Sequence, residues 1–366
     1  MKTVDVVLPG GGARCYKIGI GVTLPHAIAE DLLEFAAPPR WAIISDDMVA
    51  PLYAYPLAHA LRAAGATVDC FDFPAGEAAK SRDTVAQLQD SLIGKGCRRD
   101  SWIVGVGGGV AGDLAGYVAA TLFRGIAYVQ VPTTLLAMVD SSIGGKTGID
   151  TSQGKNLVGA IHQPRRVLVD VSTLDSLPEG EMSAGLAEVI KYGVILDAAL
   201  FTELEEGLVE VCLERSQPQL EALVVRCCRL KASVVEADET ESDLRQVLNF
   251  GHTVAHAIET VLGYGLRHGE AVAIGMVAEA RLAQWLVGAA ADLPVRIEEL
   301  CRRAGLPTRL PAGCAVGEVI DAAHRDKKVR AGQLRCALPS ALGQMATGPS
   351  GSGIPVEPAE LEAAIR

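Results

Sequence analysis

Short apolar segments alternate with amphipathic segments along the first half of the chain. Apolar runs bounded by polar or glycine residues predict strands at residues 40–45, 67–73, 101–106 and 126–131. Between these runs, apolar positions at helical spacing predict helices at residues 56–65, 81–92 and 112–121. Because strands and helices alternate, we expect an α/β domain with a mostly parallel, Rossmann-like sheet that is covered by helices on both faces.

The pattern becomes helical after about Gly180. Long amphipathic stretches predict helices at residues 182–196, 218–236, 244–262, 270–286 and 294–304, and the next strand is expected only at residues 335–338. The turn-forming segment Asp175-Ser176-Leu177-Pro178 predicts a domain boundary. We therefore expect a nucleotide-binding domain at 1–177 and a mainly helical metal- and substrate-binding domain at 178–366, with a ligand site between them. The segment 348–358 is rich in Gly, Ser and Pro and is expected to be loose or peripheral.

The chain has 366 residues and a formal net charge of −11, which disfavours nucleic acid as a partner. A small anionic substrate is compatible with this charge, because Lys and Arg can gather locally in a cleft. No apolar run is long enough to span a membrane, and no signal peptide is apparent at the N-terminus. The nine cysteines form no CxxC pair, which indicates a reduced, cytoplasmic protein with structural thiols.

A glycine-rich turn, Gly107-Gly108-Gly109-Val110-Ala111-Gly112-Asp113, follows one predicted strand and opens a predicted helix. Glycines let backbone N–H groups approach a pyrophosphate, and a helix N-terminus favours its charge. The spacing matches neither the usual dinucleotide fingerprint nor a P-loop, so a simple tight turn is the alternative to dinucleotide binding. Asp113 is expected either to accept a hydrogen bond from a ribose hydroxyl or to be a solvated acid in the first helical turn.

Two lysines and an asparagine stand in the glycine-bearing segment that follows the last predicted strand of the first domain. Lys146, Lys155 and Asn156 can form a phosphate clamp, because ammonium groups supply charge and the amide supplies geometry. An exposed polar loop is the alternative. Thr133 and Thr134 end the preceding strand, and ligands bind at this end of the strands in such sheets.

Four side chains form a candidate metal site: Glu188, His252, His256 and His268. Two histidines four residues apart on a helix, together with a remote carboxylate, are a common zinc pattern. The spacing alone therefore favours His252 and His256 as ligands. Glu188 and Lys191 are three residues apart, so they share one face of another predicted helix. Ordinary hydrogen-bonded histidines are the alternative.

A polar stripe accompanies the predicted helix at 244–262. Its members are Glu241, Arg245, Asn249, His252 and His256, which recur every three or four residues and are expected on one side of a helix. Such a stripe either faces solvent or lines an active site. We favour the active site, because the side chains are chemically varied and the opposite side of the helix is apolar.

These motifs resemble those of 3-dehydroquinate synthases, members of the sugar-phosphate cyclase superfamily. The resemblance runs from about Ile43 to about Gly343 and is strongest at residues 107–113, 131–156, 185–193, 248–256 and 268–276. Iron-type alcohol and glycerol dehydrogenases share the fold that the resemblance implies, but not this set of polar residues. The glycine-bearing stretch at residues 8–14 is not part of the resemblance.

The resemblance implies two cofactors, NAD and a divalent metal that is usually zinc, with cobalt as the alternative. The residues implied to contact NAD are Asp46, Glu77, Lys80, Gly108, Gly109, Asp113, Thr133, Thr134 and Lys155. The implied metal ligands are Glu188, His252 and His268. The resemblance thus replaces His256 with His268 as the third ligand.

A phosphorylated sugar acid is the implied substrate. The residues implied to bind it are Asp140, Lys146, Asn156, Lys191, Lys231, Arg245, Asn249 and one of Lys327 and Lys328. Glu241 and His256 are implied to transfer protons, and the catalytic group also includes Lys191, Arg245 and Asn249. Arg124 is implied to reach the substrate phosphate of a neighbouring subunit, which implies a homodimer.

The implied reaction converts 3-deoxy-D-arabino-heptulosonate 7-phosphate to 3-dehydroquinate and phosphate in the shikimate pathway. Transient oxidation by NAD acidifies a C–H bond, phosphate leaves by β-elimination, hydride returns and an aldol step closes the ring. The main competing hypothesis is an amino-dehydroquinate synthase or another sugar-phosphate cyclase, although Lys231, Arg245, Asn249 and His256 favour a carboxylate-bearing substrate over a valiolone-type reaction. Two further hypotheses are a metal-dependent alcohol or glycerol dehydrogenase and an inactive binding protein.

Overall fold

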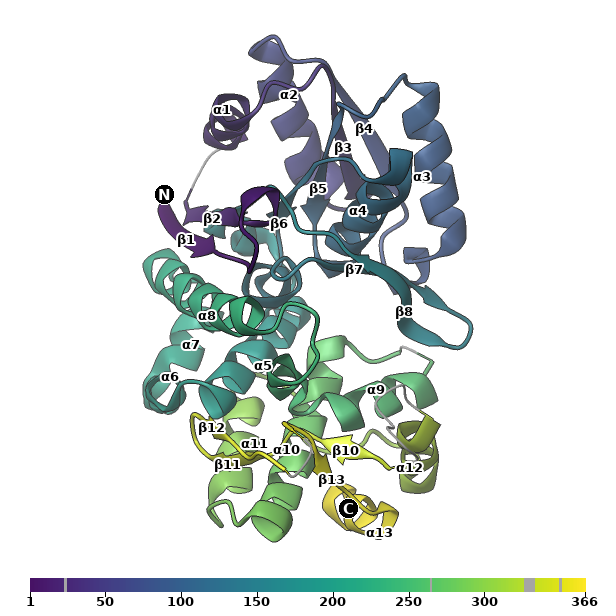
Figure 1. Cartoon of the computed structure of the whole chain (residues 1–366). Helices are drawn as coiled ribbons and strands as arrows, with labels where there is room; N and C mark the ends of the chain where they lie inside the picture. Colours follow the sequence, from purple (N-terminus) through teal and green to yellow (C-terminus); the bar gives the residue numbers. More distant parts are fainter. Residues whose placement is uncertain (23–24, 264, 326–332, 349–350) are drawn as a thin grey trace. The chain divides into compact units, whose positions relative to one another are not determined.

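The computed structural model describes residues 1–366 except 23–24, 264, 326–332 and 349–350 (Figure 1). The chain forms two compact units: Met1–Leu177 with Gln217–Glu236, and Pro178–Ser216 with Ala237–Arg366. Helix α8 (Gln217–Ala237) thus belongs almost entirely to the first unit, although it follows the boundary expected at residue 177. A single cut of the chain therefore does not separate the two units.

A seven-stranded sheet forms the centre of the first unit, in the order β1-β2-β9-β6-β5-β3-β4. Its strands are β1 (Lys2–Val6), β2 (Tyr16–Gly21), β3 (Trp41–Asp46), β4 (Val68–Phe73), β5 (Trp102–Gly107), β6 (Tyr128–Pro132) and β9 (Arg166–Asp170). All neighbours are parallel except β1 and β2, which form an antiparallel hairpin. The four predicted strands and the predicted α/β class are confirmed.

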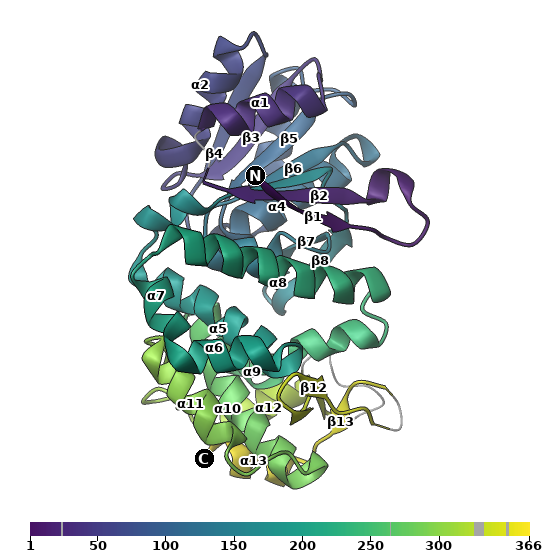
Figure 2. The same ribbon diagram turned by 90° about the vertical axis from the view of Figure 1, so that its left-hand side faces the viewer.

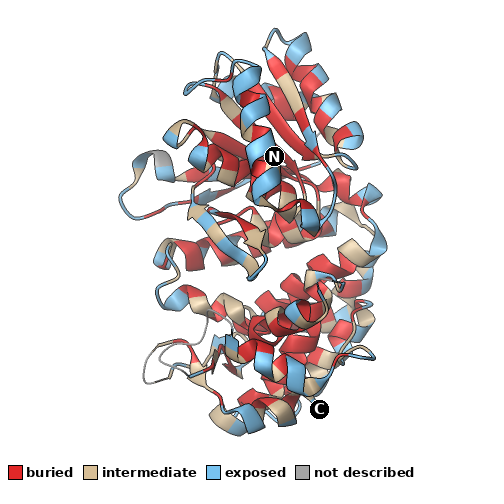
Figure 3. Ribbon diagram, turned by 90° about the vertical axis from the view of Figure 1, so that its right-hand side faces the viewer, coloured by how far each residue is buried: buried red, intermediate tan, exposed pale blue. Residues whose placement is uncertain are grey.

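Two hydrophobic cores cover the two faces of this sheet. Helices α1 (Pro25–Phe35) and α2 (Tyr55–Ala63) pack into one core, and α3 (Arg82–Gly94) and α4 (Gly109–Thr121) pack into the other. Successive residues of a strand point to opposite faces, so Ile43 enters the first core and Ile44 the second. Both side chains are fully buried, and Figure 3 shows the central strands of the sheet largely in the colour of buried residues. The three helices predicted in this region are confirmed.

The polar segment after β6 folds into an antiparallel hairpin that the pattern did not predict. Its strands are β7 (Lys146–Thr151) and β8 (Gly154–Ile161). The strands approach closely at paired glycines, since a Cβ at Gly159 would lie 2.2 Å from the carbonyl oxygen of Thr147. The N-terminal hairpin β1–β2 was also not predicted. It lies alongside α8 (Figure 2), where Lys2 pairs with Glu221 at 3.1 Å.

Helices dominate the second unit. They are α5 (Glu179–Ile195), α6 (Ala198–Glu203), α7 (Val209–Leu213), α9 (His252–Val261), α10 (His268–Val287), α11 (Leu293–Arg303), α12 (Val316–Arg325) and α13 (Pro358–Ile365). Short strands β10 (Arg335–Cys336), β11 (Pro339–Ala341), β12 (Gln344–Met345) and β13 (Ile354–Pro355) complete it. Helix α10 packs against α5, α9, α11 and α13, so it is the central helix of this unit.

Two expectations for this unit are wrong. The helix predicted at 244–262 is broken, because Leu244–Asn249 forms a 3-10 helix and Gly251 adopts a left-handed conformation with φ of 80° before α9 begins. Within the segment 348–358, expected to be loose or peripheral, the described residues Ile354–Pro355 are not loose. There β13 pairs with β10, and α13 follows and packs against α10. Apolar spacing did not reveal either feature, because both depend on contacts with α10 or a distant strand.

No helix in the described part of the chain is long and apolar enough to cross a membrane. All nine cysteines are described, and none of them forms a disulfide.

Candidate active site

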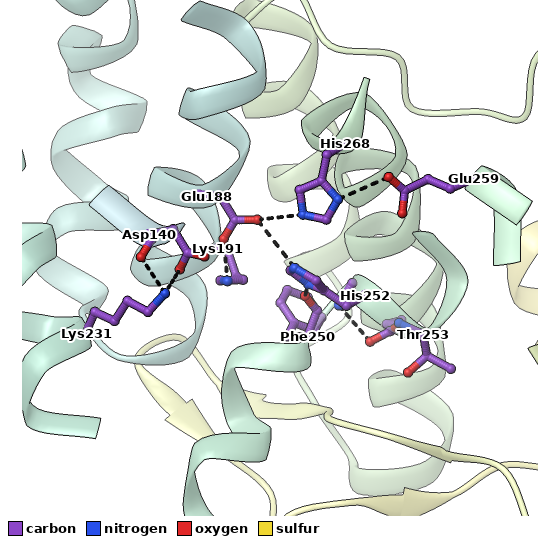
Figure 4. A network of polar contacts seen from close by, with 11 residues as sticks. Asp140, Glu188, Lys191, Lys231, Phe250, His252, Thr253, Glu259 and His268 are labelled. Carbon is purple, nitrogen blue, oxygen red and sulfur yellow. Dashed lines mark hydrogen bonds and ion pairs between the residues drawn. The ribbon is translucent and has the colours of Figure 1, made fainter. Parts of the chain in front are cut away.

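Three helices of the second unit bring together one carboxylate and two imidazoles. Glu188 stands on α5, His252 is the first residue of α9 and His268 is the first residue of α10. Oε1 of Glu188 lies 3.5 Å from Nε2 of His252 and 3.7 Å from Nε2 of His268. Figure 4 shows the three side chains pointing toward one another. One ligand atom from each lies within 4.8 Å of the other two, as a shared metal ion requires.

The chemistry of this cluster fits a divalent metal. Zinc bonds of about 2.0–2.2 Å in a tetrahedron separate the ligand atoms by about 3.3–3.6 Å, close to the observed distances. Glu188 is fully buried, and its Oε1 has no hydrogen-bond partner among the described residues. An unsatisfied buried carboxylate oxygen is costly, and a bound cation removes that cost. Imidazole and carboxylate donors suit zinc or cobalt.

Both histidines present the same ring nitrogen to Glu188. Nδ1 of His252 lies 3.0 Å from the carbonyl oxygen of Phe250, and Nδ1 of His268 lies 3.3 Å from Oε1 of Glu259. With the proton on Nδ1, each ring donates to its oxygen and presents the lone pair of Nε2 to a metal. The sequence pattern did not point to Glu259 as a functional residue. The only sign of Glu259 in the sequence is that it is the one acidic residue of α9.

Small residues set the separation of the ligand-bearing helices. Gly269 follows His268, and a Cβ at Gly269 would lie 2.2 Å from the carbonyl oxygen of Ala184. Ala184 stands one helical turn before Glu188 on α5. Helices α5 and α10 therefore meet backbone to backbone beside two of the three ligand residues.

His256 lies beside this group rather than in it. Its ring centroid is 5.7 Å from that of His252 and 6.4 Å from that of His268. The three residues whose ligand atoms lie close together are Glu188, His252 and His268. The third member is therefore His268, as the resemblance implied, and not His256, which spacing alone favoured. Spacing on one helix could not reveal a ligand that another helix contributes.

Lys191 is buried next to Glu188. Its Nζ forms an ion pair with Oε2, the carboxylate oxygen of Glu188 that does not face the histidines. The two residues are three positions apart on α5, so the predicted shared face is confirmed. The ammonium group also lies 5.2 Å from the centre of the Tyr192 ring.

The expected helical stripe does not exist, but a folded loop gathers several of its members. Asn249 donates from Nδ2 to Oε1 of Glu241 at 2.6 Å. The buried Arg245 donates from Nη1 to the carbonyl oxygen of Glu239 at 2.6 Å. Asp238 organises the loop by accepting backbone N–H groups, including that of Arg245. Burial raises the pKa of Asp238, but these donors outweigh it and lower the value to about 2.

The glycine-rich turn lies at the carboxyl end of the sheet in the first unit. Strand β5 ends at Gly107, and α4 begins at Gly109, three residues earlier than the helix predicted at 112–121. A Cβ at Gly108 would lie 3.1 Å from Cγ2 of Thr134, and the N–H of Thr133 donates to the carbonyl oxygen of Gly107 at 2.9 Å. The predicted glycines and threonines therefore meet at the N-terminus of α4, where backbone N–H groups favour an anion.

A buried lysine links several predicted residues of the first unit. Nζ of Lys80 lies 2.6 Å from Oδ2 of Asp113 and 2.5 Å from Oδ1 of Asn156. Asp113 is thus half of a largely buried ion pair and not a solvated helix-end acid. Burial lowers the pKa of Lys80, but Asp113 and Glu77 outweigh it and raise the net value. Lys155 pairs with Glu77 at 3.3 Å.

Asp150 on β7 belongs to the same network, although the sequence pattern did not point to it. Its Oδ1 accepts the N–H of Asn156 at 2.9 Å. Burial raises the pKa of Asp150 to about 6. Burial also acts on Glu77, but Lys80 and Lys155 hold its pKa below the usual value. The pKa values of the two neighbouring carboxyl groups are thus shifted in opposite directions.

The remaining predicted residues occupy varied positions. Nζ of Lys231 on α8 lies 2.8 Å from Oδ1 of Asp140 and donates to its carbonyl oxygen at 2.6 Å. Asp46 ends β3 and accepts the N–H of Val49 at 2.9 Å. Lys146 and Arg124 are exposed, and Arg124 adopts a left-handed conformation with φ of 66°. Lys327 and Lys328 lie outside the described residues.

Comparisons with known proteins agree with this geometry. The family model described as 3-dehydroquinate synthase N-terminal matches residues 70–184, and the model described as 3-dehydroquinate synthase C-terminal matches residues 185–329. A 3-dehydroquinate synthase of Geobacter metallireducens is 48% identical over 92% of this chain and 89% of its own length.

Two solved structures have the same fold. A 2-deoxy-scyllo-inosose synthase complexed with carbaglucose-6-phosphate, NAD⁺ and Co²⁺ aligns with a TM-score of 0.89 and 29% identity, over 100% of this chain and 99% of its own. A 2-epi-5-epi-valiolone synthase from Streptomyces hygroscopicus with NAD⁺ and Zn²⁺ bound aligns with a TM-score of 0.85 and 28% identity, over 95% of each chain.

Proposed function

Because this chain belongs to the 3-dehydroquinate synthase family, we propose that it converts 3-deoxy-D-arabino-heptulosonate 7-phosphate to 3-dehydroquinate and phosphate, in the shikimate pathway of aromatic amino acid biosynthesis. The net reaction releases phosphate, so the enzyme is a carbon–oxygen lyase. The observation that carries the proposal is the convergence of Glu188, His252 and His268 in a chain 48% identical to a named synthase.

Two cofactors serve this reaction. When bound, NAD supplies a hydride acceptor that is regenerated, and zinc or cobalt supplies a Lewis acid for a substrate hydroxyl. Complexes of two structural relatives with NAD⁺ and Co²⁺ or Zn²⁺ support this assignment. Glu188, His252 and His268 hold the metal, while Glu259 and the carbonyl oxygen of Phe250 orient the two imidazole rings.

The first unit binds NAD in this proposal. The backbone N–H groups of Gly108 and Gly109 receive the pyrophosphate at the start of α4, where the helix N-terminus favours negative charge. The other proposed contacts are Asp46, Glu77, Lys80, Asp113, Thr133, Thr134 and Lys155. The Lys80–Asp113 pair keeps both side chains in fixed positions before the cofactor arrives.

Cationic side chains bind the anionic groups of the substrate in this proposal. Arg245 receives the carboxylate, and Lys146 and Lys231 balance the charge of the substrate's anionic ends. The remaining substrate contacts are Asp140, Asn156, Lys191, Asn249 and one of Lys327 and Lys328. Glu241 and His256 move protons, and the Asn249–Glu241 hydrogen bond keeps that carboxylate oriented.

We also propose a homodimer in which Arg124 reaches the phosphate held by the partner subunit. The exposure of Arg124 supports this role, because its guanidinium is accessible to another chain. A cytoplasmic location is part of the proposal and is supported by the nine cysteines that form no disulfide.

The test is phosphate release. Purified protein loaded with zinc is incubated with the heptulosonate phosphate and NAD, and inorganic phosphate and absorbance at the NADH wavelength are followed together. Phosphate should appear over many turnovers without net NADH. Stoichiometric NADH without phosphate would establish a dehydrogenase instead, and the amino analogue of the substrate, assayed in parallel, distinguishes an amino-dehydroquinate synthase.

A further inference from the structure

We propose that Glu279 is a positioning residue that holds the metal ligand His252 in place through the first turn of α9. The inference rests on the metal site of the proposed function and assigns a residue outside that site. Glu279 stands on α10 and is fully buried. A buried carboxylate needs strong partners, and its partners here are backbone N–H groups on both sides of His252.

Glu279 acts as the missing cap of α9. Its Oε2 accepts the N–H of Gly251 at 2.7 Å, and its Oε1 accepts those of Thr253 and Val254 at 3.0 and 3.3 Å. The first N–H groups of a helix have no partner within the helix and are usually bound by a polar side chain at the N-cap. Gly251 occupies that position and has no side chain, so the carboxylate from α10 replaces the cap.

The charge of Glu279 suits this position for a second reason. Helix N-termini carry partial positive charge, and a carboxylate near them is stabilising. Hydrogen bonds from N–H groups to an ionised carboxylate are stronger than those to a neutral amide oxygen. A neutral side chain of the same size therefore cannot replace Glu279 without loosening the first turn of α9.

Backbone packing restrains the same residues. Gly275 stands one turn before Glu279 on α10, and a Cβ there would lie 1.9 Å from the carbonyl oxygen of Gly251. Gly251 itself has φ of 80°, and a Cβ on it would lie 2.7 Å from Cγ of Met276. His252 is therefore flanked by Gly251 and Thr253, whose N–H groups are both held by one carboxylate of α10.

This arrangement couples the metal ligands to one another. Helix α10 supplies His268 as a ligand at its first residue and positions His252 through Glu279 three turns later. A shift of the first turn of α9 would move His252 relative to both Glu188 and His268. Partners that orient metal ligands typically contribute about 10–100-fold to metal affinity or activity.

The experiment measures zinc affinity by competition with a chromophoric chelator and records the visible spectrum of the cobalt-loaded protein. We expect Glu279→Gln to weaken zinc binding by about 10–100-fold and to change the cobalt spectrum. Glu279→Asp keeps the charge and should bind zinc with intermediate affinity. Zinc affinity and cobalt spectrum equal to those of the unmutated protein in both variants would overturn the proposal.

The matched control is Asp197→Asn. Asp197 caps α6 in the same unit, where its Oδ1 accepts the N–H of Leu200 at 3.0 Å. The variant makes the same carboxylate-to-amide change at a helix that carries no ligand, so it should keep zinc affinity and cobalt spectrum even where it lowers the unfolding temperature. An equal loss of zinc affinity in this control would show a general effect of stability and would overturn the proposal.

If Glu279→Gln does not fold, hydrogen exchange in the unmutated protein tests the same coupling between the cap and the metal site. Zinc should slow hydrogen exchange at the N–H groups of Gly251, Thr253 and Val254, because metal binding and the cap restrain the same turn. Equal hydrogen-exchange rates at these positions with and without bound zinc would contradict the coupling between the Glu279 cap and the metal site. If the unmutated protein binds no zinc at all, the proposed function fails, which is a separate and distinguishable result.

Discussion

Glu259 on α9 faces His268 on α10, with Oε1 of the carboxylate 3.3 Å from Nδ1 of the imidazole. Glu259 is almost fully buried, so this contact is screened little by solvent. The helix that carries the ligand His252 thereby orients a second ligand on its neighbour. Since Glu279 of α10 binds the start of α9, each of these two helices supports the ligand of the other.

Glu259→Gln should weaken zinc binding by about 10–100-fold, because an amide is a poorer partner for the Nδ1–H of a ligating histidine. Chelator competition with the purified protein measures this affinity. Glu298→Gln is the control, since this glutamate of α11 contacts Thr308 and no ligand. Equal zinc affinity in the Glu259 variant and the unmutated protein would show that the contact does not orient the ring.

Gly269→Ala should disrupt the metal centre, because the added Cβ would lie 2.2 Å from the carbonyl oxygen of Ala184 and force α5 and α10 apart. Overpacking of this kind costs about 1–3 kcal/mol of unfolding free energy. Both zinc affinity and the denaturant midpoint should fall. Gly317→Ala on α12 is the matched control, since a Cβ there meets no atom within 4 Å, and it should leave both quantities unchanged or raise stability.

Arg245→Ala should lower kcat/KM for the heptulosonate phosphate by about 30-fold or more, because removing a buried charge partner of a carboxylate costs about 2–5 kcal/mol. NAD binding, measured by calorimetry, should persist. Arg302→Ala, on an exposed position of α11, controls for loss of an arginine as such. If the Arg245 variant loses NAD binding as well, the substrate role is wrong.

The stability of the first unit should fall as pH rises from about 4.5 to about 6. In this window the folded protein keeps the proton of Asp150, whose pKa is raised to about 6, while the unfolded chain releases it near its usual value of 3.8. Glu77 has a lowered pKa, so its contribution has the opposite sign and changes only below its usual value of 4.5. Burial also raises the pKa of Asp113 in the same unit, so a variant of Asp150 is needed to separate the two contributions.

Asp150→Asn removes this titration and should flatten the decline. The measurement is the urea midpoint between pH 4.5 and 7, followed by the fluorescence of Trp41 and Trp102, which both lie in the first unit. Trp285 of the second unit is exposed and should respond less to unfolding. An unchanged slope in the variant would assign the titration to another group.

The sequence by itself determined four strands of the first unit's sheet and three helices of the second unit, whereas α6, α7, α12 and α13 were not predicted. Strands β3 to β6 and helices α5, α10 and α11 follow from apolar periodicity, which is a local property of the chain. The glycine-rich turn at the start of α4 could also be predicted from local sequence, because its glycines directly follow a buried apolar strand that ends at Gly107. The motifs shared with the synthase family indicated Glu188, His252 and His268 as metal ligands, whereas spacing alone favoured His256 in place of His268.

Only the tertiary structure decided what depends on partners remote in the chain. The break at Gly251 follows from its close contact with α10, and the return of α8 to the first unit follows from packing that no local pattern records. Glu259, Glu279 and Asp150 were missed, because an acidic residue in a sequence looks solvated until the fold buries it against a donor. The metal centre needs three helices at once, so its geometry exists only when they are packed together.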